Sequence, residues 1–259
     1  MSADEPFRLS GRVAVVTGSS SGLGEAIAHE LAAAGAAVVI SSRELGRAQA
    51  VAAAITEAGG TALPVAGDVT RVEAVEELAA RAREELGGLD VWVNNAGIGM
   101  VRPSLELTLE DWQRTLDLDL TAAFVGCQVA GRHMVAAGRG VIVNVSSIAG
   151  HTALPQRAAY CTAKHGLVGL TKVLSAEWAP HGVRVVSVDP AFVMTPLVRQ
   201  TMADGRFAEE DILRRTPLGR LGEGAEVARA VRFLASDAAS YVTGAQLMVD
   251  GGWTANGGW

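Results

Sequence analysis

Three side chains in the middle of the sequence have types and spacing that suit proton transfer. Tyr160 and Lys164 are four positions apart in a run, 158–178, that the sequence predicts to be a helix, so both project from one face. A free phenol has a pKa of about 10, and a neighbouring cation favours the phenolate. Ser147, upstream of both, can hydrogen-bond a carbonyl or hydroxyl oxygen and hold it near the phenol.

A tyrosine and a lysine at helical spacing are, however, more often a half-buried ring and a solvated charge. A second pattern near the start of the chain favours chemistry: the run Thr17-Gly-Ser-Ser-Ser-Gly-Leu-Gly24, between an apolar run and a helical one. Gly18 permits a tight turn, Gly22 lets the backbone approach a pyrophosphate, and Gly24 lets the helix pack on the strand. The helix N-terminus then offers free N–H groups to the phosphates, and we expect Ser20, Ser21 and Leu23 to join the glycines.

The end of the second apolar run bears on the choice between NAD and NADP. A carboxylate there would hydrogen-bond the ribose 2′-hydroxyl and repel a 2′-phosphate. The sequence has Ser41-Ser42-Arg43 instead, and an arginine can pair with a phosphate while serines donate hydrogen bonds to it. The alternative is that Arg43 only flanks a surface helix beside Glu44. We favour NADP over NAD.

Short apolar runs alternate with helical ones along the whole chain. This order predicts a doubly wound, Rossmann-type α/β fold: a seven-stranded parallel sheet with helices on both faces and the ligand beyond the carboxyl ends of the strands. We expect one domain, 1–259, with the polar segment at about 195–216 as a lid over the site. The predicted strands are 12–17, 37–41, 61–66, 89–93, 140–146, 183–188 and 245–249, and the predicted helices are 22–34, 44–58, 71–86, 109–137, 158–178 and 223–234.

Composition excludes several other classes of protein. The chain has 259 residues, is 49% hydrophobic and 19% charged, and has a net charge of −6, with no basic cluster that would predict nucleic-acid binding. The five histidines lack metal-ligand spacing, and the two cysteines form no CxxC pair, so we expect no metal and a reduced, cytoplasmic protein. No apolar stretch is long enough to cross a bilayer, and no signal-peptide pattern begins the chain.

The motifs together closely resemble those of the short-chain dehydrogenase/reductase family, in its single-domain group of about 250 residues. The glycine loop, the run Asn94-Asn95-Ala96-Gly97, Ser147 and Tyr160-x3-Lys164 occur in order in one chain. The resemblance covers nearly the whole sequence and implies an NADP-binding oxidoreductase. By the same resemblance, Ser147 orients the reacting oxygen, Tyr160 is the acid/base, and Lys164 binds the nicotinamide ribose and lowers the tyrosine pKa.

The resemblance also implies further cofactor contacts. Asp68 and Val69 resemble the pair that flanks adenine, and Asn95, Ala96 and Gly97 resemble the loop that supports the sheet and lines the cofactor. Pro190, Val193 and Thr195 resemble residues near the carboxamide.

Two positions depart from the family pattern. Asp119 occupies the place of the family's fourth catalytic residue, an asparagine whose backbone helps to hold a water in the proton relay to the lysine. A backbone role survives this change, but we expect the added carboxylate to attract Lys164 and weaken its effect on Tyr160. The second departure is Ala191, which replaces a glycine after Pro190. An alanine is strained at positive φ, so the local turn is expected to differ.

The resemblance predicts reversible hydride transfer between NADPH and a ketone or secondary alcohol. The alternative is a sensor or scaffold that binds NADPH and has lost turnover, which Asp119 favours and the intact Ser-Tyr-Lys set opposes. The run that ends in Pro217-Leu-Gly-Arg220 faintly resembles gluconate 5-dehydrogenases, with 3-oxoacyl-carrier-protein reductases and general ketone reductases as close alternatives. Expected substrate-lining residues are Ile148, His151, Leu154, Gln156, Arg157, Met194, Leu197 and Met202.

The resemblance further implies a homotetramer, with contacts through the helices that hold Trp112 and Trp178 and through the last strand and tail. Trp253 and Trp259 lie in a glycine-rich tail, where exposure of two indoles to water is costly. We therefore expect these two residues to dock at an interface or over a neighbouring site.

Overall fold

A single parallel sheet organises the fold. The structure is a computed structural model that describes residues 5–203 and 208–257, apart from the side chains of Leu197, Gln200, Thr201 and Ala203. In this part of the chain the sheet has seven strands, as the alternation of runs predicted. Their order across the sheet is β3-β2-β1-β4-β5-β6-β7. The strands are β1 Val13–Val16, β2 Ala37–Ser42, β3 Thr61–Ala66, β4 Val91–Asn94, β5 Gly140–Val145, β6 Val183–Pro190 and β7 Gln246–Val249.

The central strands are apolar on both faces because helices cover both. In β1, Val15 pairs in register with Val39 of β2 on one side and Trp92 of β4 on the other. All four residues of β1 and all four of β4 are buried. A parallel strand buried on both faces gains from β-branched side chains, which pack well on the pleated surface.

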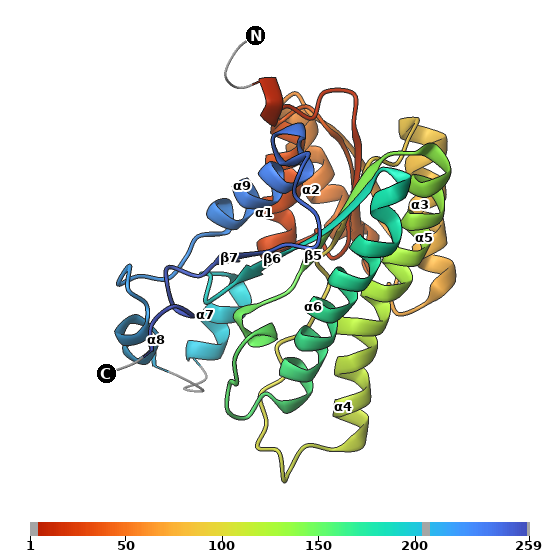
Figure 1. The fold of residues 1–259 in the computed structure, drawn as a ribbon. Helices are drawn as coiled ribbons and strands as arrows, with labels where there is room; N and C mark the ends of the chain where they lie inside the picture. The colour runs from red at the N-terminus through yellow and green to blue at the C-terminus, as the bar shows by residue number, and fades with distance from the viewer. Residues whose placement is uncertain (1–4, 204–207, 258–259) are drawn as a thin grey trace.

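The helices form two layers, seen on opposite sides of the sheet in Figure 1. Helices α1, α2 and α9 pack with one set of strand side chains, and α3, α5 and α6 pack with the other. No helix in residues 5–203 or 208–257 is long and apolar enough to cross a membrane. The helices are α1 Gly22–Ala33, α2 Leu45–Glu57, α3 Val72–Leu86, α4 Leu109–Leu116, α5 Ala122–Ala137, α6 Ala158–Trp178, α7 Pro196–Ala203, α8 Glu209–Arg215 and α9 Gly224–Ala235.

The strand order reverses between β1 and β4, and this reversal places the site. Successive connections from β1 lead outward to β2 and β3, whereas the chain then returns to β4 and continues to the other edge. The loops after β1 and β4 therefore diverge and leave a crevice beyond the carboxyl ends of the strands. The glycine loop follows β1, and Asn95 follows β4.

The segment 109–137 differs from the single helix that the sequence predicted. Helix α4 ends at Leu116, and a π-helical turn, η2 Asp117–Thr121, links it to α5. One extra residue is thus inserted without a break in the helical path, and such insertions occur mostly at functional sites. The inserted turn buries Asp119 and directs it toward α6.

The predicted lid, 195–216, contains α7 and α8. Residues 204–207 between them lie outside the described part of the chain, as does the side chain of Leu197. The role of this segment as a lid stays a prediction.

The premise behind the expectation for Trp253, an indole that the tail would otherwise leave in water, does not hold. The Trp253 side chain is buried within the chain itself, at 4% exposure, beneath the Arg215 guanidinium, whose carbon lies 3.7 Å from the ring centroid. Phe192 flanks it, with ring centroids 6.2 Å apart. The indole is already covered, so it gives no argument for an interface; Trp259 lies outside the described residues.

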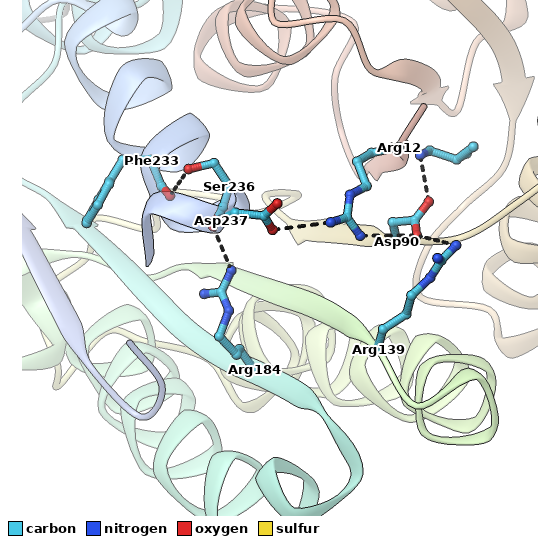
Figure 2. A network of polar contacts seen from close by, with 8 residues as sticks. Arg12, Asp90, Arg139, Arg184, Phe233, Ser236 and Asp237 are labelled. Atoms are coloured by element: carbon cyan, nitrogen blue, oxygen red, sulfur yellow. Dashed lines mark hydrogen bonds and ion pairs between the residues drawn. The ribbon is translucent and has the colours of Figure 1, made fainter. Parts of the chain in front are cut away.

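A network of ion pairs joins the amino ends of the strands, at the edge of the sheet away from the crevice (Figure 2). The buried carboxylate of Asp90 accepts a hydrogen bond from the Val13 N–H at 3.0 Å. It also lies 3.2 Å from an Arg139 nitrogen and 3.7 Å from one of Arg12. Arg12 continues to Asp237 at 3.2 Å. This amino-edge network links the starts of β1, β4 and β5 to the end of α9.

Candidate active site

A cleft of about 1200 Å³ lies at the carboxyl ends of the strands and unites the two sequence motifs. The residues predicted for the cofactor and for catalysis all line it. Of the described residues predicted near the substrate, the cleft is lined by Ile148, Leu154 and Arg157 but not by His151, Gln156, Met194 or Met202. The lining residues from the cofactor and catalytic predictions are Gly18, Ser20, Ser21, Gly22, Leu23, Gly24, Ser42, Arg43, Asp68, Val69, Asn95, Ala96, Gly97, Asp119, Ser147, Tyr160, Lys164, Pro190, Val193 and Thr195.

The glycine loop has the backbone conformation that a tight turn requires. Gly18 and Gly22 have φ values of 62° and 59°, which side chains with a Cβ rarely adopt. The reason for Gly24 differs from the predicted packing of helix on strand. A Cβ there would lie 2.4 Å from the Asn95 amide nitrogen and 2.4 Å from the Gly18 oxygen. Gly24 therefore makes room for the asparagine that holds the loop.

Asn95 ties the glycine loop to the end of β4. Its side-chain amide donates to the Thr17 and Gly18 carbonyls at 2.9 and 3.1 Å. Its backbone N–H donates to the Thr17 hydroxyl at 3.0 Å, which also accepts from Ala96 N–H. The loop is thus held in shape by the protein alone.

The N-terminus of α1 points into the cleft with its first N–H groups available. Ser21 is the residue before the helix, and no side chain caps the helix there. Uncapped N–H groups and the positive end of the helix dipole bind phosphate. The loop and helix together fit the pyrophosphate of a dinucleotide.

The far end of the cleft combines Arg43 with Asp68. Arg43 is exposed at the tip of β2, and Ser42 beside it accepts from Glu44 N–H at 3.2 Å. Asp68 accepts from the backbone and hydroxyl of Thr70. These bonds, with a smaller contribution from Arg43, hold the pKa of Asp68 below its usual value. No acidic residue occupies the end of β2.

Helix α6 brings Tyr160 and Lys164 to one side of the cleft. The Lys164 ammonium lies 5.5 Å from the centroid of the Tyr160 ring and donates to the Val145 carbonyl at 3.0 Å. Ser147 follows β5, and its hydroxyl accepts from Ala149 N–H at 3.1 Å. The three side chains predicted to handle a proton therefore line one wall of one cleft.

Asp119 forms an ion pair with Lys164, as the sequence led us to expect. The carboxylate is fully buried, with Oδ1 3.4 Å from the ammonium nitrogen and Oδ2 accepting from Ile98 N–H at 3.0 Å. Burial raises the pKa of Asp119, and Lys164 opposes that rise. A Cβ on Gly97 would lie 2.5 Å from Oδ1, so the glycine makes room for the carboxylate.

A second buried carboxylate, Asp189, was missed in the sequence. It ends the apolar run of β6, and its Oδ2 lies 2.6 Å from Nε2 of His151. Burial raises the pKa of Asp189, and the bond to His151 opposes that rise, with a weaker contribution from Lys164. The signal available was a carboxylate next to the last residue of a valine-rich strand, after the run Val185-Val-Ser-Val188.

The backbone near the site has two features of note, and the first confirms the expectation for Ala191. Ala191 does not have a positive φ, so the turn after β6 avoids the strain that alanine would suffer there. Among the described non-glycine residues, only Gln156 has a positive φ, at 64°. This conformation stands directly before Arg157 at the start of α6 and costs about 1 kcal/mol or more.

No group of three or more His, Cys, Asp or Glu side chains in the described ranges could hold a metal ion.

Comparisons with known proteins agree with this geometry. A family model described as Enoyl-(Acyl carrier protein) reductase matches residues 18–254. The chain is 48% identical over 245 residues to a cis-4-hydroxycyclohexanecarboxylate dehydrogenase of Sinomonas cyclohexanicum, covering 94% of this chain and 97% of that one. It is 42% identical over 255 residues to a D-threitol dehydrogenase of Mycolicibacterium smegmatis, covering 98% and 97%. An NAD-dependent glycerol dehydrogenase of Listeria innocua is 38% identical over 251 residues, covering 97% of each.

Solved structures share the fold over nearly the whole chain. A short-chain type dehydrogenase/reductase from Mycobacterium marinum superposes with a TM-score of 0.91 at 40% identity, covering 96% of this chain and 98% of that one. A gluconate 5-dehydrogenase from Burkholderia cenocepacia, in complex with NADP and tartrate, gives a TM-score of 0.93 at 36% identity, covering 98% and 99%.

Proposed function

The chain belongs to the short-chain dehydrogenase/reductase family, and we propose that it interconverts a ketone and a secondary alcohol with NADP(H) as the hydride carrier. The observation that carries the proposal is the single cleft that holds a dinucleotide-type loop at one end and Ser147, Tyr160 and Lys164 at the other. A nicotinamide cofactor, when bound, accepts or supplies the hydride. The protein has to bind and orient the reactants and move one proton.

Tyr160 is the proton carrier in this proposal. In alcohol oxidation its phenolate takes the hydroxyl proton, and in ketone reduction its phenol protonates the developing alkoxide. The Lys164 ammonium, 5.5 Å from the ring, stabilises the phenolate electrostatically. Ser147, on the same wall, donates a hydrogen bond to the reacting oxygen and holds it at the phenol.

A substrate panel tests the proposal. Purified protein is supplied with alcohols and oxidised cofactor, or with ketones and NADPH, and the reduced cofactor is followed by its absorbance. We expect turnover with at least one alcohol or ketone. Cofactor binding without turnover across a broad panel would instead support the alternative, a sensor or scaffold with the same fold.

The preference for NADP rests on the end of β2. Arg43 is exposed there beside Ser42, and no carboxylate stands where it would repel a 2′-phosphate. We expect Arg43→Ala to weaken NADPH binding about 10-fold or more and to leave NADH binding within about twofold. Arg47→Ala, an exposed arginine lining the same end of the cleft, is the matched control. Equal losses of affinity for NADPH and NADH in Arg43→Ala would refute the preference for NADP. The measurement matters because one of the relatives is NAD-dependent.

We also propose that the protein acts as a homotetramer in the cytoplasm, as the family resemblance implies. Light scattering that returned the mass of one chain would contradict the tetramer.

The substrate class is the open part of this proposal. The relatives' names include polyols and cyclic hydroxy acids, which differ in charge. The charges at the substrate end of the cleft therefore bear on which of these two classes the protein accepts.

A further inference from the structure

Arg157 is a cation placed at the substrate end of the cleft without a partner. It is half-buried, lines the cleft, and directly precedes α6. Within residues 5–203 and 208–257, no side chain forms a hydrogen bond or ion pair with its guanidinium. A Cβ built on Gly99 would lie 3.7 Å from its Nη1, so the guanidinium faces the loop after β4.

The position of Arg157 is unfavourable for a cation in two ways. Burial lowers the pKa of Arg157, and among the described residues the phenol of Tyr160 and the thiol of Cys161 oppose this. The N-terminal end of a helix carries partial positive charge, which repels a guanidinium. An anion beside the guanidinium would offset both costs. The residue before it, Gln156, has a strained φ of 64°, so the backbone that carries Arg157 is held in an uncommon conformation.

Arg157 also lies close to the catalytic side chains of α6. It is the residue directly before the helix, with non-helical angles of φ −125° and ψ 36°, and it lines the same cleft as Tyr160 and Lys164. Three residues separate it from Tyr160, which corresponds to about 5 Å along a helix axis. A backbone hydrogen bond of 2.7 Å from Arg102 N–H to the Gln156 carbonyl fixes the turn against the loop that forms the opposite wall.

The other cations that line the cleft are either paired or exposed. Lys164 is buried and pairs with Asp119. Arg43 and Arg47 are exposed at the end that holds the glycine loop, where Arg47 pairs with Glu44. Arg114 also lines the cleft, from α4, and its side chain is exposed near Glu110 and Asp117. Among the cations of the cleft in the described residues, Arg157 is thus the half-buried one without an ion pair.

We propose that Arg157 binds an anionic group of the substrate, so that the preferred substrates are hydroxy acids or oxo acids rather than neutral alcohols or ketones. This inference rests on the proposed oxidoreductase function and names its substrate class. The carboxylate pairs with the guanidinium while the reacting carbon lies at Tyr160, which places the two groups on opposite ends of a small molecule. Charge-assisted, bidentate pairing of this kind also orients the substrate.

The test compares one alcohol in anionic and neutral form. The probes are cis-4-hydroxycyclohexanecarboxylate and the corresponding carboxamide, which have nearly the same shape. In the wild-type protein we expect kcat/KM for the acid to exceed that for the amide by about 10- to 100-fold. Arg157→Gln should remove that advantage, mainly through KM, and leave the amide within about threefold. Arg157→Lys should recover part of it, because the charge returns without the bidentate geometry.

Arg83→Gln is the matched control, since it removes one exposed arginine of α3 that does not line the cleft. It should leave the ratio of acid to amide unchanged. The melting temperature and the cofactor Kd of Arg157→Gln should match the wild type, which separates substrate binding from folding. Equal kcat/KM for acid and amide in the wild type, or equal losses for both in Arg157→Gln, would overturn the inference.

A binding measurement keeps this inference distinct from the proposed function. Cyclohexanecarboxylate has no hydroxyl to oxidise, so its Kd is measured by titration in the presence of cofactor without any turnover. We expect it to bind at least about 10-fold more tightly than cyclohexanecarboxamide, and Arg157→Gln to erase the difference. Absence of turnover across the broad panel of alcohols and ketones would refute the oxidoreductase, whereas equal binding of cyclohexanecarboxylate and cyclohexanecarboxamide would refute the anion site.

Discussion

The two edges of the sheet use charge in opposite ways. At the amino edge, the carboxylate of Asp90 meets two arginines and a backbone N–H, and Arg12 passes the contact on to Asp237 (Figure 2). At the carboxyl edge, Oδ1 of the buried Asp119 has only a 3.4 Å ion pair, and Arg157 has no ionic partner in the described ranges. The amino edge satisfies its charges within the protein, whereas the carboxyl edge leaves capacity for a ligand.

This difference separates the charges that stabilise the fold from those that remain available to a ligand. Arg184 at the amino edge, for example, donates to the carbonyls of Ser236 and Val242, both at 3.2 Å, and so fastens the start of β6 to the end of α9. A buried ion with few partners reduces stability, because its desolvation exceeds the attraction that it gains. The protein keeps such ions at the edge where a reaction can use them. Substitutions at the amino edge should therefore change stability, and those at the carboxyl edge should change chemistry.

Asp90→Ala should have the largest effect on stability. It leaves the buried Val13 N–H without an acceptor and two arginines without their shared carboxylate. We expect a loss of about 2–3 kcal/mol in the free energy of unfolding, or roughly 5–10 °C in melting temperature. Asp90→Asn, which keeps an acceptor for Val13, should lose less than half as much. If Asp90→Ala also changed kcat/KM by more than about twofold, the amino edge would affect the chemistry as well as the stability, which would contradict the division between the two edges.

Asp119→Asn should have an intermediate effect, on the pH dependence of turnover. The amide keeps an acceptor for Ile98 N–H but removes the negative charge beside Lys164. The lysine then stabilises the phenolate more fully, so the acid limb of the alcohol-oxidation profile should move by roughly one pH unit to lower pH. Asp117→Asn is the control, because Asp117 accepts from Gln113 instead. A profile unchanged by Asp119→Asn would show that the carboxylate does not act on the proton transfer.

The same substitution has a predictable effect on stability. The pKa of Asp119 is raised in the folded protein. The contribution of Asp119 to the free energy of unfolding is therefore most favourable below the pKa of the unfolded state, about 3.8, and it declines as the pH rises through the raised pKa of the folded state. The asparagine does not titrate. Asp119→Asn should therefore gain stability relative to the wild type between pH 4 and neutral pH. Chemical denaturation at several pH values would show this, and a constant difference would contradict it.

Glu226→Gln should have the smallest effect and provides a reference from a residue that does not line the cleft and is not part of the amino-edge network. Glu226 pairs with Arg220 at 2.7 Å and accepts from Glu223 N–H, which lowers its pKa to about 2. A lowered pKa stabilises the fold above the unfolded value of about 4.5, and this contribution is lost as the pH falls from there toward 2. The variant should lack that pH dependence and lose about 1–3 °C at pH 7. A larger loss than that of Asp90→Ala would reverse the predicted ranking.

Local sequence patterns predicted the fold and the main cofactor-binding and catalytic residues of the site. Alternating valine-rich and helical runs predicted the sheet, and the glycine loop predicted the dinucleotide end. Tyr160 and Lys164 could be placed together because helical spacing alone decides their relation. Ser147 was a candidate from its chemistry, and the family resemblance supported it and added Asn95.

Features that depend on contacts between distant segments could not be predicted. The π-helical turn that buries Asp119 interrupts a run with ordinary helical composition, and it brings Asp119 to Lys164 of α6, 45 positions away. His151 and Asp189 meet across 38 positions. Trp253 was expected at an interface or over a neighbouring site, and only the folded chain shows that Arg215 covers it.

The most direct test of the account is the turnover of Tyr160→Phe. The change removes one hydroxyl from the wall that also holds Ser147 and Lys164, and no ion pair depends on it. We predict that kcat falls by about 1000-fold or more while the cofactor Kd stays within about twofold and the melting temperature is unchanged. A variant that kept most of its rate would contradict proton transfer by Tyr160.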